Sequence, residues 1–135
     1  MTVQLLTGRW RDVFEAMEAR EVLRFTPVRI SLGVPRYMPS GRGFPAIREL
    51  MPVGELFKLE GDEFDAGFRQ HLANVGIDRI RERCEEVYAI GGKPLLLLCF
   101  ENVQAGRRCH RITFGRWWME QTGEIVSEVE PAQRD

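Results

Sequence analysis

The sequence predicts a small three-layer α/β domain with a mainly parallel sheet flanked by helices. Apolar runs and amphipathic stretches alternate along the 135 residues, as they do where strands and helices build a parallel sheet. In addition, residues 95–98 are consecutive leucines. A strand that is apolar on both faces fits the centre of a sheet covered by helices on each side.

Composition limits the size of the fold and its partners. With 44% hydrophobic and 29% charged residues, the chain suits one domain with a single core, which we assign to residues 1–130, followed by a flexible tail at 131–135. The net charge of -1 makes nucleic acid a less expected partner than a small anionic ligand. No apolar run reaches the roughly 18 residues of a membrane span, so we expect a cytoplasmic protein without a membrane partner.

The first half of the chain is expected to hold two short strands and a helix. Residues 3–6 can form a strand that Thr7 and Gly8 end. Residues 9–17 carry apolar side chains at three- and four-residue spacing, which predicts an amphipathic helix. Residues 28–30 form a β-branched run, and residues 33–45 contain three prolines and three glycines. This last segment is therefore predicted to be an irregular surface loop, and long loops in compact domains are often functional.

The second half is expected to be mainly helical around the leucine strand. Residues 46–51 suit one or two helical turns. Apolar spacing predicts helices over 61–73 and from 77 to the glycine pair 91–92, which is a typical helix stop. Residues 109–121 are expected to form the last helix, and residues 124–129 alternate as an edge strand does.

The junction between the leucine strand and the last helix is the predicted site. In α/β folds, ligands bind outside the carboxyl ends of the strands. Cys109 falls on the first turn of a helix beside guanidinium groups, and both features favour a thiolate. We therefore predict Cys109 as a nucleophile, His110 as acid or base and Glu101 as the group that orients them.

Two other interpretations of these residues stay open. Free cysteines are usually buried packing residues, so Cys109 can be structural, with His110 capping a turn. Alternatively, Cys99, Cys109, His110 and Glu101 offer zinc-type ligands. Their spacing is not a recognised zinc pattern, and adjacent residues seldom point at one ion, so we predict no metal and no cofactor. The odd number of cysteines argues against a disulfide framework and favours a reducing compartment.

The loop after the second strand supplies the predicted ligand-binding groups. Arg29 lies inside an apolar strand, so it either faces a polar site or the strand prediction is wrong. Arg36 and Tyr37 suit a phosphate or a nucleobase, and Arg111 and Cys99 complete this ligand-binding set from the opposite loop. Equally, Tyr37 and Phe44 can simply pin the loop to the core.

Three further side chains are expected to be outside the site. Cys84 falls on the apolar face of its helix and is predicted to be structural. His71 has polar neighbours and is predicted to be exposed. Of the pair Trp117 and Trp118, at least one indole is expected inside the core.

The strand ending in Cys99-Phe100-Glu101, followed by Cys109-His110-Arg111, resembles domain-of-unknown-function family 488. That family has an apolar strand ending in Cys-x-Glu and then Cys-His-Arg, and the resemblance covers roughly residues 26–130. Family members often have Asp-x-Arg on the early strand, where this chain has Val28 and Ile30 around Arg29. The resemblance implies a compact α/β domain with a cleft between two loops, and no established activity.

Together these patterns predict an enzyme or ligand-binding domain for an anionic, nucleotide-like group. Its cleft is expected between the loops at 31–45 and 101–109. Whether the domain is an enzyme, and what its oligomeric state is, do not follow from the sequence. The alternative is a module without catalysis that associates with nucleic acid or binds a protein through the exposed loop and Trp117 or Trp118.

Overall fold

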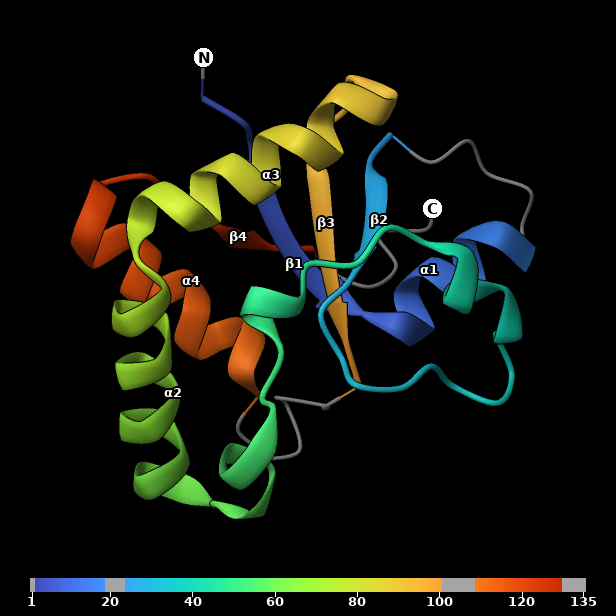
Figure 1. Ribbon diagram of the computed structural model, residues 1–135. Coiled ribbons are helices and arrows are strands. Elements are labelled where there is room, and N and C mark those ends of the chain that lie inside the picture. Colours follow the sequence, from blue (N-terminus) through green and yellow to red (C-terminus); the bar gives the residue numbers. More distant parts are fainter. Residues whose placement is uncertain (1, 19–23, 101–108, 130–135) are drawn as a thin grey trace.

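The computed structural model describes residues 2–18, 24–100 and 109–129 (Figure 1). In chain order, its strands and α-helices are β1 (Leu5–Arg9), α1 (Trp10–Glu18), β2 (Thr26–Arg29), α2 (Gly61–Val75), α3 (Ile77–Gly91), β3 (Leu95–Cys99), α4 (His110–Thr122) and β4 (Ser127–Glu128). Three short 3₁₀ helices, η1 (Pro39–Gly43), η2 (Arg48–Leu50) and η3 (Gly54–Lys58), lie between β2 and α2. The predicted α/β class is confirmed.

The sheet has four parallel strands in the order β2-β3-β1-β4. The leucine strand β3 therefore has a neighbour on each side, as a central strand should. In the register of the central pair, Leu5 lies opposite Leu95 and Arg9 lies opposite Cys99. The carboxyl ends of β1 and β3 thus come side by side at one edge of the sheet.

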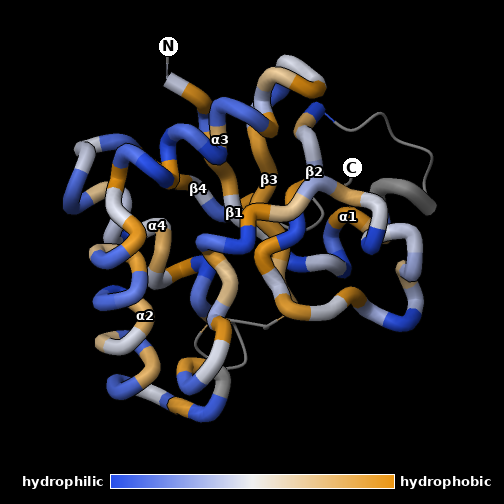
Figure 2. The backbone as a smooth tube through the Cα atoms, in the orientation of Figure 1, coloured by the Kyte–Doolittle hydropathy of each residue, from blue (hydrophilic) through white to orange (hydrophobic). Residues whose placement is uncertain are grey.

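Alternate side chains of β3 enter two separate apolar clusters. Leu95, Leu97 and Cys99 pack with residues of α2, α3 and α4. Leu96 and Leu98 pack on the other face with residues of α1. The sheet is consequently the middle of three layers, and Figure 2 shows its central strand β3 in the hydrophobic colour.

Local boundaries differ from the predictions in several places, among them β2, which spans Thr26–Arg29 and not 28–30. Thr7 and Gly8 do not end β1, which continues to Arg9, because Thr7, Gly8 and Arg9 pair with Leu97, Leu98 and Cys99 of β3. A Cβ atom on Gly8 would lie 3.1 Å from Cδ1 of Leu96 on the neighbouring strand. The segment 33–45 contains the regular turn η1, and the edge strand shortens to Ser127–Glu128.

No helix in the described parts of the chain is long and apolar enough to cross a membrane. The predicted tail at 131–135 lies outside the described residues.

Candidate functional site

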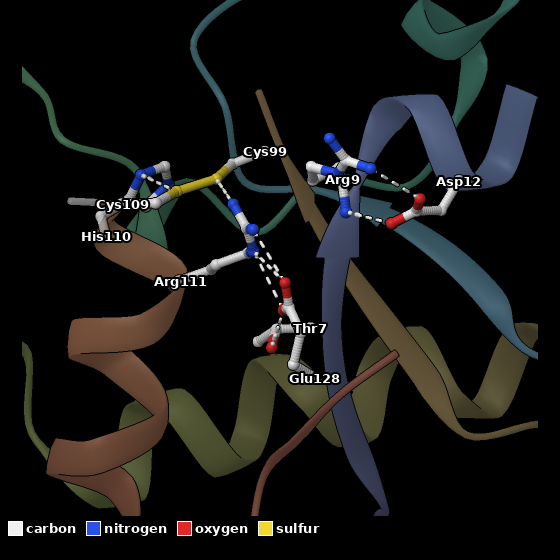
Figure 3. Close-up of polar contacts among 8 residues, drawn as sticks. All are labelled: Thr7, Arg9, Asp12, Cys99, Cys109, His110, Arg111 and Glu128. Atoms are coloured by element: carbon white, nitrogen blue, oxygen red, sulfur yellow. Dashed lines mark hydrogen bonds and ion pairs between the residues drawn. A yellow bond between two sulfur atoms is a disulfide. The ribbon is translucent and has the colours of Figure 1, made fainter. Parts of the chain in front are cut away.

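The site lies where the chain leaves two adjacent strands in opposite directions. From β1 the chain passes through α1 on one face to β2, and from β3 it passes through α4 on the other face to β4 (Figure 1). Such a point, outside the carboxyl ends of the strands, is where open α/β sheets bind ligands. The residues that gather here come from β1, β3 and β4 and from the first turns of α1 and α4 (Figure 3).

Cys99 and Cys109 are joined by a disulfide in this structure. Cys99 is the last residue of β3, and Cys109 caps the amino end of α4. Both sulfurs belong to the core cluster beneath α4, so the strand and the helix meet through them. The prediction of a free Cys109 thiol is therefore wrong for this form, because the fold brings residues ten positions apart into contact.

His110 is buried beside this sulfur pair and has a defined tautomer. Its Nε2 lies 2.7 Å from the backbone oxygen of Ile30. A carbonyl oxygen only accepts, so Nε2 must carry the proton and Nδ1 must be the bare acceptor. Nδ1 lies 3.8 Å from Sγ of Cys109. Burial, helped by the nearby Arg111 charge and opposed by the bond to Ile30, lowers the pKa of His110 to about 4, so the ring is neutral at pH 7.

Adjacent residues converge here because Cys109 is not helical. Cys109 has an extended backbone with φ -127° and ψ 140°, whereas His110 is the first residue of α4. The change from extended to helical backbone turns both side chains toward the end of β3 (Figure 3). Adjacent residues were expected seldom to point at one ion, but this cap geometry brings Cys109 Sγ within 3.8 Å of His110 Nδ1.

Arg111, one of the predicted ligand-binding residues, is buried and paired with Glu128. Its side chain is 1% exposed, and its Nε and Nη2 donate to the Glu128 carboxylate at 3.0 and 2.8 Å. Nη1 donates to Sγ of Cys99 at 3.0 Å. Thr7 Oγ1 donates to the same carboxylate at 2.7 Å. Arg111 therefore joins the sulfur pair to β4 and β1 and faces inward.

Glu128 was not predicted as a site residue. The alternating pattern of an edge strand does not reveal that its carboxylate pairs with the buried Arg111 guanidinium. Arg9, the last residue of β1, and Asp12 of α1 lie at the same edge and were not predicted either. The Asp12 carboxylate accepts from the backbone N–H of Arg9 at 3.2 Å and lies 3.4 Å from its guanidinium. Burial raises the pKa of Asp12 despite these contacts. The i,i+3 spacing at a helix start was the available signal.

Arg29 does lie in a strand, but its side chain is on the other face of the sheet from the sulfur pair. Val28 and Ile30 both belong to the cluster that contains Cys99, and side chains alternate along a strand. Arg29 Nη1 donates to the backbone oxygens of Ser31 and Leu32. Its Nε is buried without a hydrogen-bond partner among the described residues.

The other predicted loop residues are near the surface. Arg36 is exposed. Tyr37 packs edge-on against Phe14 of α1, with the Arg11 guanidinium 5.5 Å from its ring centroid. Phe44 stacks on Trp10. These contacts support the alternative in which the aromatic residues pin the loop. Glu101 lies outside the described residues.

The side chains predicted to lie outside the site are mostly as expected. Cys84 is buried, and burial raises its pKa to about 12. The prediction for His71 is wrong, because the side chain is half-buried and its Nε2 lies 2.9 Å from the backbone oxygen of Glu49. Trp117 and Trp118 are both buried, which confirms their core role and leaves neither indole as an exposed contact.

A surface pocket of about 190 Å³ adjoins the site between α4 and β4. It is lined by Thr7, Arg111, Ile112, Gly115, Arg116, Met119, Val126 and Glu128. The Arg111–Glu128 pair forms part of its wall, and Arg116 is exposed at the pocket. The pocket therefore leaves room for a small molecule beside the Arg111–Glu128 pair.

No protein-family model, curated protein or solved structure matches this chain.

Proposed function

We propose that this protein is a thiol-dependent enzyme that acts on a small anionic, nucleotide-like substrate when its Cys99–Cys109 disulfide is reduced. The observation that carries the proposal is the 3.8 Å approach of Cys109 Sγ to the bare Nδ1 of His110. A cysteine beside a base whose other nitrogen is held by a third group is the arrangement that nucleophilic catalysis needs. Here the third group is the carbonyl of Ile30.

Each group has one role in the proposed reaction. Nδ1 of His110 takes the thiol proton of Cys109 while the sulfur forms a bond to the electrophilic atom of the substrate. The bond to the leaving group breaks, and His110 returns the proton to that group. Water then cleaves the sulfur–substrate bond with the same residue as base.

The anionic substrate class is supported by cations around the carboxyl edge of the sheet. Arg9 ends β1 and its side chain is 24% exposed, Arg36 is exposed in the loop after β2, and Arg116 is exposed at the pocket beside Arg111. Planar guanidinium groups suit phosphate and carboxylate. Arg111 supports the site indirectly, since its charge is already paired with Glu128. We also propose that the chain belongs to family 488, on the basis of its Cys-x-Glu and Cys-His-Arg motifs.

Alkylation of the reduced protein tests the nucleophile. Iodoacetamide near neutral pH, followed by peptide mass spectrometry, should label Cys109 faster than a free cysteine in solution. His110→Ala should slow this labelling, whereas Cys84→Ser should leave it unchanged. A parallel melting experiment with nucleoside mono-, di- and triphosphates tests the ligand class, because a bound ligand stabilises the folded state. Ordinary reactivity at Cys109, together with no rise in melting temperature for any nucleotide, would overturn the proposal.

A further inference from the structure

We propose that the reduced Cys99, Cys109 and His110 form a binding site for Zn²⁺. The sulfur atoms of both cysteines and a ring nitrogen of His110 all lie within 4.8 Å of one another, and all three residues are buried. Two thiolates and one imidazole are ligands that zinc accepts, and three protein ligands leave the fourth tetrahedral position open. The site goes beyond the proposed function, because metal binding needs no substrate.

The spacing of the ligand atoms already approaches that of a zinc centre. A sulfur at about 2.3 Å and a nitrogen at about 2.1 Å from one tetrahedral ion are separated by about 3.6 Å. Cys109 Sγ and His110 Nδ1 are 3.8 Å apart. The Cα atoms of Cys99 and Cys109 are 7.5 Å apart, which leaves room for the two sulfurs to separate around an ion after reduction.

The groups that hydrogen-bond to the three ligand side chains are also typical of a metal site. A metal-binding histidine usually donates its second ring N–H to a carbonyl or carboxylate, which fixes the tautomer. His110 does this through Nε2 and the Ile30 oxygen, and it leaves Nδ1 facing the sulfurs. Arg111 donates to Sγ of Cys99 at 3.0 Å, and such a charge-assisted contact stabilises a thiolate.

The disulfide and the metal-bound form are alternative states of one site. A dithiol reductant supplies two electrons and two protons, which convert the sulfur–sulfur bond to two thiols while the reductant becomes a disulfide. Zn²⁺ then displaces the two thiol protons to solvent and binds both sulfurs. Zinc would consequently occupy the thiolate of Cys109 and block its attack on a substrate, so that oxidation and metal each control the same nucleophile.

Co²⁺ is the direct probe, because it replaces Zn²⁺ and is coloured. Full-length protein is reduced with a phosphine, freed of metal and titrated with Co²⁺ alone under nitrogen. We expect one Co²⁺ to bind per chain. The complex should show sulfur-to-cobalt charge-transfer absorption in the near ultraviolet, and visible absorption bands as intense as those of tetrahedral Co²⁺. Added Zn²⁺ should displace Co²⁺ and so remove both absorptions. Cys99→Ser should remove most of the charge-transfer absorption, and His110→Ala should weaken binding by about tenfold or more.

Two matched variants separate the site from other thiols and imidazoles. Cys84→Ser and His71→Ala change the remaining buried cysteine and the remaining histidine, and both should leave the titration unchanged. Zn²⁺ should also protect Cys99 and Cys109, and not an added free thiol, from iodoacetamide in the wild-type protein. This protection assay needs no variant and so remains informative if Cys99→Ser fails to fold.

The inference is overturned by an absent charge-transfer band, by equal binding to the oxidised protein, or by full retention of the band in Cys99→Ser. These results differ from those that test the enzyme. A protein that binds Co²⁺ at this site but has an ordinary Cys109 alkylation rate and no nucleotide response would keep the metal site and lose the proposed enzyme. The reverse pattern would keep the enzyme and remove the metal.

Discussion

Arg111 and Glu128 form a bidentate ion pair between the first turn of α4 and the edge strand β4. The guanidinium is almost fully buried, whereas the Glu128 side chain is 35% exposed. Among the described residues, strand β4 pairs with β1 through two residue pairs, so these backbone hydrogen bonds alone hold it weakly. The ion pair, together with the Thr7 bond to the same carboxylate, therefore contributes to the attachment of β4.

Removing this carboxylate should destabilise the whole domain. Glu128→Gln removes the carboxylate that pairs with the buried Arg111 guanidinium, and we expect the free energy of unfolding to fall by about 2 kcal/mol, less than for a fully buried pair because water reaches Glu128. Urea unfolding followed by circular dichroism measures the change. Glu82→Gln, which removes the exposed partner of Arg79, should change stability by no more than about 0.5 kcal/mol. Equal effects of the two substitutions would contradict this account.

Glu49 should stabilise the fold in a pH-dependent way. Burial raises the pKa of its carboxyl, but hydrogen bonds from its own backbone and from Arg83, with the charges of Arg83 and Arg79, outweigh burial and lower it. A lowered folded-state pKa adds stability above the ordinary value of 4.5 and loses it as pH falls through the folded value. Glu49→Gln should thus reduce unfolding free energy by about 1 kcal/mol at pH 7, with the difference shrinking below pH ~4. A difference that is constant between pH 7 and pH ~3 would rule this out.

Gly41 is expected to tolerate no side chain. A Cβ atom there would lie 2.6 Å from Cζ3 and 2.8 Å from Cη2 of Trp10, and that indole is fully buried with its Nε1 bonded to Ser31. Gly41→Ala should lower the unfolding free energy by about 2 kcal/mol through overpacking. Gly43→Ala is the matched control, because a methyl group at Gly43 would meet nothing within 4 Å. Thermal melts of both variants measure the difference, and similar melting temperatures would refute the close approach.

Cys84 should be chemically silent while the domain is folded. It is buried, and burial raises its pKa to about 12, so almost no thiolate exists at pH 8. Without reductant, iodoacetamide should label no cysteine in folded protein and one in urea. Intact mass gives the number of labels directly. Rapid labelling of Cys84 in the folded state would show that the α3 face opens more readily than its packing indicates.

The elements that sequence patterns predicted well are those whose signal is local. The four leucines of β3 and the apolar spacing of α2, α3 and α4 reflect burial that each segment undergoes wherever it packs. The predicted end of β1 was wrong because Gly8 and Arg9 pair with Leu98 and Cys99 of another strand, and no local pattern records that pairing. The helix start at His110 was placed to within one residue by its flanking residue types.

The sequence indicated a group of residues near the end of β3, but not how their side chains pair. Cys109, His110 and Arg111 were chosen from residue types on a helix start, and the structure brings the first two together beside Cys99. The direction of Arg111 depends on Glu128, which is 17 residues away, and the face of Arg29 depends on the register of β2. Such partners are properties of tertiary contacts, which the spacing of side chains along one segment does not contain.

The Cys99–Cys109 link gives the chain two different covalent topologies. The sequence between the two cysteines contains Arg107 and Arg108, and trypsin cleaves after arginine. A cut there leaves the oxidised polypeptide as one covalent unit, because the bridge spans the nick. The same cut in the reduced polypeptide yields two fragments that part in denaturant, one ending after β3 and the other carrying α4. Gel mobility after limited digestion, with and without a thiol in the loading buffer, therefore reports the redox state of this junction inside a mixed sample.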